Sequence, residues 1–164
     1  SRCAGAGLRF VALDHQGNGA RAPEEAELIG DIVEELLNGG RWRDKEGAEH
    51  GLTPEDILIV APYNLQVGAL RARLPALRER VGTVDRFQGQ EAPVVIYSLT
   101  SSSPDDAPRS MSFLYDPHRF NVATSRAMAL CILVGQPALF APECKTPTQM
   151  RMANAFCRYL ELCG

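Results

Sequence analysis

The chain has 164 residues, 45% of them hydrophobic and 23% charged, which is the composition of one globular domain that can bury a continuous core. Its formal net charge of −3 excludes a basic field over the whole surface, so any nucleic-acid contact must be local or shared with another domain. No apolar run is long enough to cross a bilayer, and the N-terminus SRCAGAG has neither an initiator Met nor a signal-peptide pattern. We therefore expect an intracellular, cytoplasmic piece of a longer protein with no membrane partner.

Cysteine usage agrees with an intracellular location. The five cysteines are odd in number and form no CxxC pair of the kind that binds zinc or forms a redox dithiol. The three histidines are scattered, with no partner spacing for a metal or a catalytic triad. We expect reduced thiols, with Cys131 in the core, and histidines that are solvated or structural.

The first half of the chain predicts a strand, a helix and a second strand. Residues 8–14, LRFVALD, have a strand pattern. Residues 23–38, PEEAELIGDIVEELLN, predict an amphipathic helix because Pro23 stands near its first turn, acids follow, and one face is apolar. A charged loop over 39–53 then leads to the continuous apolar run 57–61, which is typical of a parallel strand buried on both faces.

The second half continues the alternation of helices and strands. Residues 64–74 predict a helix, and strands recur at 81–85, 93–100 and 130–136. Residues 120–128 and 147–163 are the remaining helical candidates, and residues 100–112 predict a mobile surface loop. This alternation predicts a single α/β domain, a three-layer sandwich around a mostly parallel sheet.

Polar clusters adjoin three of these strands. APYNLQ follows one strand, VDRFQGQE follows another, and RFNVATSRA comes just before the last. Ligands of open α/β sheets gather at the carboxyl ends of the strands. We therefore expect the three clusters to converge on one edge of the sheet.

The three segments LIVAPYNLQ, TVDRFQGQE and RFNVATSRA, in this order and spacing, resemble motifs IV (or IVa), V and VI of superfamily 1 helicases. The resemblance is to the second RecA-like domain, which has the fold of P-loop NTPases, and it covers about Leu8 to Phe140. It is closest to the 5′-to-3′ branch that includes the nonsense-mediated-decay helicase. Ala22 stands where that branch commonly has Asn, and the GN…R.PEEAE version resembles bacterial members with a RecB-like nuclease region.

Arg126 is the arginine-finger candidate and the predicted catalytic residue. A planar guanidinium with a permanent charge is suited to stabilising a transferring γ-phosphoryl group. The alternative is a surface arginine that caps a helix or pairs with an acid. The resemblance to motif VI favours the finger.

Motif V supplies most of the other predicted site residues. In the family the position of Glu91 faces the nucleotide, Gly89 permits the turn, and Gln88 offers an uncharged donor and acceptor. The positions of Thr83, Val84, Asp85 and Arg86 contact nucleic acid or couple it to the ATP site. A tight turn with a satisfied Asp85 is the alternative, and Phe87 is expected to be a core anchor.

The remaining predicted site residues come from motifs IV and VI. Tyr63 lies near the interdomain cleft in the family, and a half-buried tyrosine at a helix N-cap is an equally good interpretation. Asn121 and Ser125 flank Arg126 and are suited to bonding motif V or phosphate. The predicted nucleotide-binding residues are therefore Gln88, Gly89, Glu91, Tyr63 and Asn121, and the predicted nucleic-acid-binding residues are Thr83, Val84, Asp85, Arg86 and Ser125.

The sequence has no GxxxxGK[ST] phosphate loop and no Asp-Glu pair after a strand to hold magnesium. In the family these lie on the first RecA-like domain, so the resemblance implies that ATP and Mg²⁺ are bound mainly there. This chain would supply the second face of the ATPase site in a helicase acting on single-stranded DNA or RNA, and would be inactive alone.

Two other functions stay open from the residues alone. The first is a non-catalytic module that binds nucleic acid or protein on a degenerate RecA-like fold. The second is a Rossmann-type enzyme, which is disfavoured because no GxGxxG opens a helix after a strand.

Overall fold

The computed structural model describes residues 7–87, 89–103, 105, 106, 108 and 116–140, and residues 147, 148, 150, 151, 154, 157 and 158. Within this part of the chain, no helix has both the length and the apolarity that a membrane span requires. Most of the helix predicted over 147–163 lies outside the described residues.

A five-stranded parallel sheet forms the centre of the molecule. Its order is β1-β7-β6-β4-β5, and every neighbouring pair is parallel. The strands are β1 (Gly7–Ala12), β4 (Ile57–Val60), β5 (Val81–Gly82), β6 (Ala92–Ser98) and β7 (Ala127–Gly135). The predicted α/β fold with a mostly parallel sheet is confirmed.

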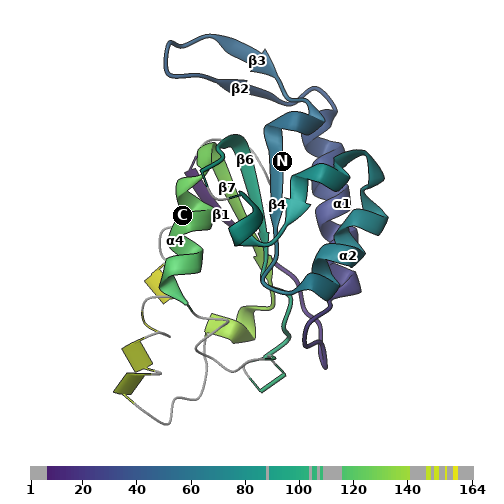
Figure 1. Cartoon of the computed structure of the whole chain (residues 1–164), viewed down its shortest axis with the longest axis vertical. Helices are drawn as coiled ribbons and strands as arrows, with labels where there is room; N and C mark the ends of the chain where they lie inside the picture. Colours follow the sequence, from purple (N-terminus) through teal and green to yellow (C-terminus); the bar gives the residue numbers. More distant parts are fainter. Residues whose placement is uncertain are drawn as a thin grey trace.

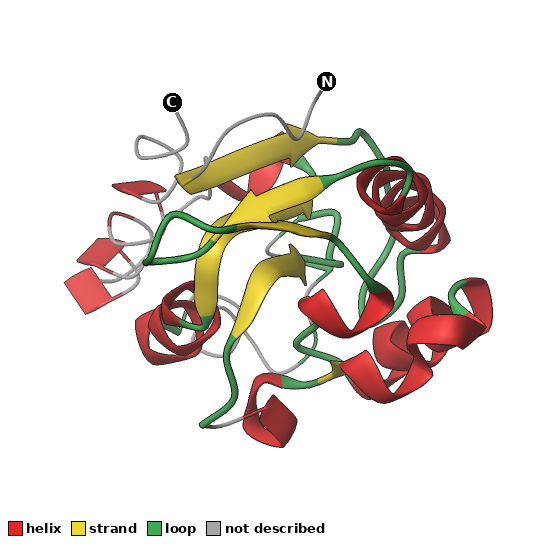
Figure 2. Ribbon diagram, turned by 90° about the horizontal axis from the view of Figure 1, so that it is seen from above, coloured by secondary structure: helices red, strands yellow, loops and turns green. Residues whose placement is uncertain are grey.

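Helices cover both faces of the sheet (Figures 1 and 2). The helices α1 (Pro23–Leu37) and α2 (Asn64–Arg73) pack on one face, and α4 (Pro117–Ser125) packs on the other. The strand β4 is apolar throughout because its alternate side chains enter two different cores: Ile57 and Ile59 join the first cluster, and Leu58 and Val60 join the second. The structure therefore has the three layers that the sequence predicts.

The charged loop predicted over 39–53 is a hairpin instead. It pairs β2 (Arg41–Arg43) with β3 (Glu49–Gly51) in antiparallel register and extends away from the main sheet (Figure 1). The rings of Trp42 and His50 stack across it with centroids 4.9 Å apart, and a hydrogen bond from His50 lowers the pKa of Asp44. Such side-chain pairs stabilise the hairpin without an alternating apolar pattern, so neither strand could be predicted from periodicity.

The two ends of the strands define two opposite edges of the sheet. The carboxyl edge holds the ends of β4, β5 and β6, and the amino edge holds the starts of β6 and β7. Two connections run between these edges. One is residues 83–91, which lead from the end of β5 to the start of β6, and the other is α4, which leads down to the start of β7.

Candidate functional site

The carboxyl edge carries an open hollow with a cavity volume of ≈ 360 Å³. Its lining includes Ala20, Tyr63, Thr83, Asp85, Pro108 and Arg119. Tyr63 is the N-cap residue of α2 and is 6% exposed, so the predicted N-cap position is confirmed and the side chain is more deeply buried than expected. Its hydroxyl donates to the carbonyl oxygen of Pro108 at 3.3 Å. We call this feature the carboxyl-edge hollow.

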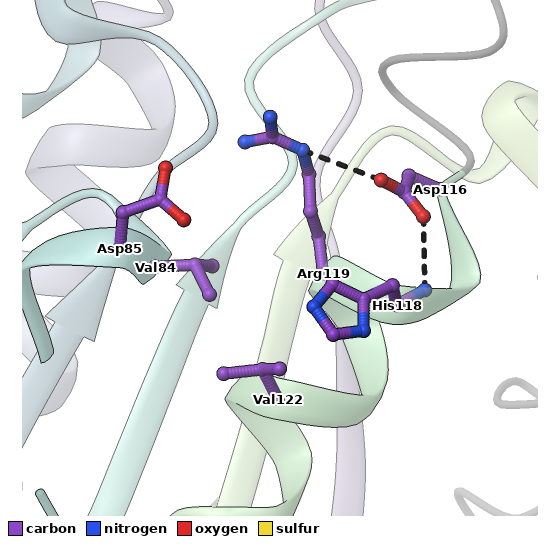
Figure 3. Close-up of a pocket in the computed structure, with 6 residues that line it drawn as sticks. All are labelled: Val84, Asp85, Asp116, His118, Arg119 and Val122. Carbon is purple, nitrogen blue, oxygen red and sulfur yellow. Dashed lines mark hydrogen bonds and ion pairs between the residues drawn. The ribbon is translucent and has the colours of Figure 1, made fainter. Parts of the chain in front are cut away.

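A smaller pocket of ≈ 90 Å³ adjoins the hollow and shares Asp85 and Arg119 with it. Figure 3 shows Val84 and Asp85 on one side and the start of α4 on the other. The carboxylate of Asp116 accepts from the backbone N–H of His118 at 2.9 Å and lies 3.5 Å from Nε of Arg119. The pocket therefore combines one arginine, which pairs with Asp116, with the carboxylates of Asp85 and Asp116.

The amino edge brings the end of motif V beside the end of α4. Ala92 donates its N–H to the carbonyl oxygen of Arg126 at 3.0 Å, and Ala92 pairs with Ala127 in the sheet. Glu91, which precedes Ala92, is exposed, and Gly89 has a φ of +82°, a backbone conformation that favours glycine. These contacts place Glu91 and Arg126 at the same edge of the sheet.

Arg126 itself is the C-cap residue of α4 and is partly buried. Its Nε is buried and lacks a hydrogen bond within the described residues, and no carboxylate of that part of the chain forms an ion pair with it. A buried donor without a partner is unusual in a native protein and calls for an explanation. A guanidinium held ready for an external acceptor would account for it.

The prediction that all three polar clusters converge on the carboxyl edge is wrong. Residues 89–91 and Ser125–Arg126 lie at the amino edge, whereas Tyr63 and Thr83–Arg86 lie at the carboxyl edge. The reason is that residues 83–91 and α4 are crossover connections, which must return antiparallel to the strands. Motifs V and VI therefore each have one end at each edge, whereas the polar residues of motif IV lie at the carboxyl edge.

The other predicted site residues divide as follows. Val84 and Phe87 are buried in the second core cluster, which confirms Phe87 as a core anchor. Arg86 pairs with Glu79 at 2.9 Å, and the hydroxyl of Ser125 donates to the carbonyl oxygen of Val122 at 3.0 Å. Asn121 is exposed within α4, and Gln88 lies outside the described residues.

A buried polar cluster at the carboxyl edge was not predicted. It consists of His15, Glu25, Gln66, Ser98, Thr100 and Ser102, each no more than 7% exposed. Oε1 of Glu25 accepts from the Ser98 hydroxyl at 2.7 Å and from the Thr100 N–H at 2.9 Å, and its Oε2 lies 2.6 Å from Nε2 of His15. These contacts offset the free energy that burying a carboxylate costs. Residues 100–102 are thus buried, contrary to the predicted surface loop, and the rest of that loop lies largely outside the described residues.

The cluster includes a Ser–His–Glu arrangement, because the Ser102 hydroxyl lies 2.6 Å from Nδ1 of His15. The hydroxyl oxygen also accepts from the Asn18 N–H at 2.9 Å, and Ser102 is 5% exposed. The arrangement is therefore closed to substrate and structural. One residue of the cluster could have been predicted from the sequence. Glu25 falls at helical spacing with Ile29, on the apolar face of α1, where a charged side chain needs buried partners.

Burial also raises the pKa of the Tyr97 phenol, which keeps this hydroxyl protonated beside the carboxyl edge. No group of three or more His, Cys, Asp or Glu side chains within the described residues could hold a metal ion.

Comparison with known proteins gives a consistent result. Residues 12–138 match a protein-family model described as AAA domain. The chain is 33% identical over 145 residues to the DNA replication ATP-dependent helicase/nuclease JHS1 of Arabidopsis thaliana, covering 88% of this chain and 10% of that protein. It is 40% identical over 133 residues to the putative helicase mov-10-B.1 of Danio rerio and 36% identical over 134 residues to the putative helicase MOV-10 of Gallus gallus, covering 73% of this chain and 13% of each relative. The chain thus spans about a tenth of the length of these relatives.

Proposed function

The chain belongs to the AAA domain family of superfamily 1 helicases, and we propose that it is the second motor domain of an ATP-dependent helicase acting on single-stranded DNA or RNA. The predicted resemblance to this superfamily is confirmed. In our proposal the first RecA-like domain supplies the phosphate loop and the magnesium ligands, and this domain closes the ATPase site from the other side.

The amino edge would face the nucleotide. The observation that carries this assignment is the guanidinium of Arg126, whose buried Nε has no partner in the described residues and which lies beside the start of β6. An arginine that approaches the γ-phosphoryl group stabilises the charge that develops on its oxygens in the transition state. Glu91 and Gly89, with Gln88 and Asn121, are the residues that we propose to surround the nucleotide.

In our proposal, magnesium comes with the nucleotide and the first domain. Mg²⁺ would supply positive charge that offsets the charge on the phosphate groups. The residues of this chain would add the guanidinium and exclude water as the cleft closes.

The carboxyl edge would face the nucleic acid. Thr83, Asp85 and Arg119 line the hollow, and Arg86 stands on the adjoining short helix. Since residues 83–91 and α4 both extend from this edge to the amino edge, a change in the nucleotide site would be transmitted to the bound strand. Tyr63, which the resemblance assigned to the nucleotide, lies on the nucleic-acid side in this arrangement.

Three preparations test the proposal: this chain alone, the phosphate-loop domain alone, and a protein that carries both. Phosphate release with and without single-stranded DNA is the measurement. We expect nucleic-acid-stimulated hydrolysis only when both domains are present. Robust turnover by this chain alone would exclude the half-site, and no stimulation in the two-domain protein would favour the non-catalytic binding module.

A further inference from the structure

The buried polar cluster connects two loops that are far apart in the sequence. The Ser102 N–H donates to the carbonyl oxygen of Asn18 at 2.9 Å, and the Asn18 N–H donates back to the Ser102 hydroxyl at 2.9 Å. The Ser101 hydroxyl donates to the carbonyl oxygen of Gly19 at 2.8 Å. Residues 15–20 are thereby fixed against residues 100–102.

Glu25 holds this connection from inside the core. One carboxylate oxygen contacts Ser98 at the end of β6 and Thr100 in the loop that follows, and the other contacts His15 in the first loop. The network is satisfied when His15 donates from Nε2 to Glu25 and accepts at Nδ1 from the Ser102 hydroxyl. Glu25 therefore links both loops to α1 through a single side chain.

The backbone at Thr100 is held in a strained conformation by its surroundings. Its φ is +74°, in the left-handed region that a β-branched residue rarely adopts. Such a conformation persists only where surrounding contacts hold it. The hydrogen bond from the Thr100 N–H to Glu25 is one such contact.

The two loops form one wall of the carboxyl-edge hollow. Ala20 continues from the first loop and Pro108 from the second, and both line the hollow with Thr83 and Asp85. The backbone there is closely packed, because a Cβ on Gly19 would lie 2.9 Å from the carbonyl oxygen of Asp106. A shift of either loop would therefore change the shape of the hollow.

The cluster also fixes the position of α2 against the same wall. Gln66 accepts from the Ala22 N–H at 2.8 Å and donates to the Ala22 carbonyl oxygen and to the Ser98 hydroxyl, each at 3.1 Å. Tyr63, less than one turn earlier, bonds Pro108 across the hollow. Both sides of the wall thus depend on the network around Glu25.

We propose that Glu25 is a positioning residue that sets the geometry of the carboxyl-edge hollow and, through it, the affinity for a single nucleic-acid strand. The proposal rests on the proposed function, because it takes the strand as the ligand of the hollow. Glu25 does not touch the strand. It acts through Ala20 and Pro108.

The test compares Glu25→Ala, Glu25→Gln and Glu46→Ala, the last removing an exposed carboxylate near the hairpin turn. Hydrogen exchange is measured on each chain without ligand, and the Kd for a fluorescently labelled oligothymidylate is measured at low salt. We expect Glu25→Ala to lose protection at the amides of Asn18, Thr100 and Ser102, to keep it at Ile59 and Ile132, and to raise the Kd about tenfold. Glu25→Gln keeps an acceptor for Ser98 and Thr100, so it should recover most of the affinity, and Glu46→Ala should match the wild type.

Should Glu25→Ala fail to fold, Ser102→Ala replaces it, since that variant removes the hydroxyl that bonds His15 and the Asn18 N–H without leaving a carboxylate unpaired. Unchanged exchange in both loops overturns the proposal. So does an unchanged Kd when the loops exchange faster, because Glu25 would then be structural only. If the wild type itself binds no oligothymidylate, the proposed nucleic-acid function fails, and with it the claim on affinity, while the exchange data still decide whether Glu25 positions the wall.

Discussion

The N–H of Ala92 donates to the carbonyl oxygen of Arg126 at 3.0 Å, which joins the start of β6 to the end of α4. Two segments separated by more than thirty residues, which would be about 100 Å of extended chain, thus meet at one edge of the sheet. Residues 83–91, which lead into β6, and α4 both begin at the opposite edge, near the carboxyl-edge hollow. This arrangement makes residues 83–91 and α4 the physical connection between the two proposed binding surfaces.

Binding of single-stranded nucleic acid by the chain should be weak and sensitive to salt, because its net charge is −3 and the cationic groups are local. Arg86→Ala should reduce the slope of log K against log salt concentration by about 0.7, the value for one phosphate contact on a single strand. The control is Arg43→Ala, which also removes an exposed arginine paired with one glutamate but lies on the hairpin. Equal slopes for the two variants would contradict the assignment of Arg86, and tight binding at all salt concentrations would favour a dedicated binding module.

Thr100→Gly should be more stable than Thr100→Ala by about 1 kcal/mol. Glycine adopts the observed φ of +74° without steric cost, whereas alanine keeps the strain and also loses the hydroxyl. Both variants lose the hydrogen bond from Oγ1 to the Ser98 carbonyl oxygen, so their difference isolates the backbone term. Chemical denaturation of both variants measures this difference in stability. Equal denaturation midpoints would show that the loop relaxes when Thr100 is replaced.

Gly89→Ala should destabilise the chain by about 1 to 2 kcal/mol, because alanine is strained at a φ of +82°. No steric clash adds to this cost, since an added Cβ meets no atom within 4 Å. Gly47→Ala is a matched control, since Gly47 has a φ of +84° and equally open surroundings in the hairpin turn. Chemical denaturation should show a similar loss in the free energy of unfolding for both variants. In the two-domain protein, only Gly89→Ala should lower ATP hydrolysis. A parallel loss of activity in Gly47→Ala would attribute the effect to stability alone.

The sequence predicted β4 and β7 well because each contains a continuous apolar run. Residues 57–61 and 130–136 both predict buried strands, and Cys131 is in the core as expected. The hairpin was missed because its stabilising contacts are the Trp42–His50 stacking and ion pairs around Glu49, which leave no periodic pattern.

The candidate site was predicted in its residues but not in its arrangement. Motif spacing identifies which side chains belong together, yet the direction in which residues 83–91 and α4 cross the sheet depends on strand order. The buried polar cluster was missed because its members come from four separate segments of the sequence. Glu25 alone gave a local signal, as a charged residue on an apolar helix face.

The most direct test of the central claim is the turnover of Arg126→Ala in the two-domain protein. If Arg126 reaches the γ-phosphate, kcat for nucleic-acid-stimulated ATP hydrolysis should fall roughly 10³-fold, while ATP affinity and folding change far less. Arg126→Lys should lower kcat almost as much, because an ammonium lacks the planar set of donors. Arg80→Ala is the control, since Nε of Arg80 is also buried without a partner in the described residues but Arg80 lies on another element. A low kcat in both Arg126 variants beside a normal Arg80→Ala is the expected result, and near-normal turnover in Arg126→Ala would contradict the account.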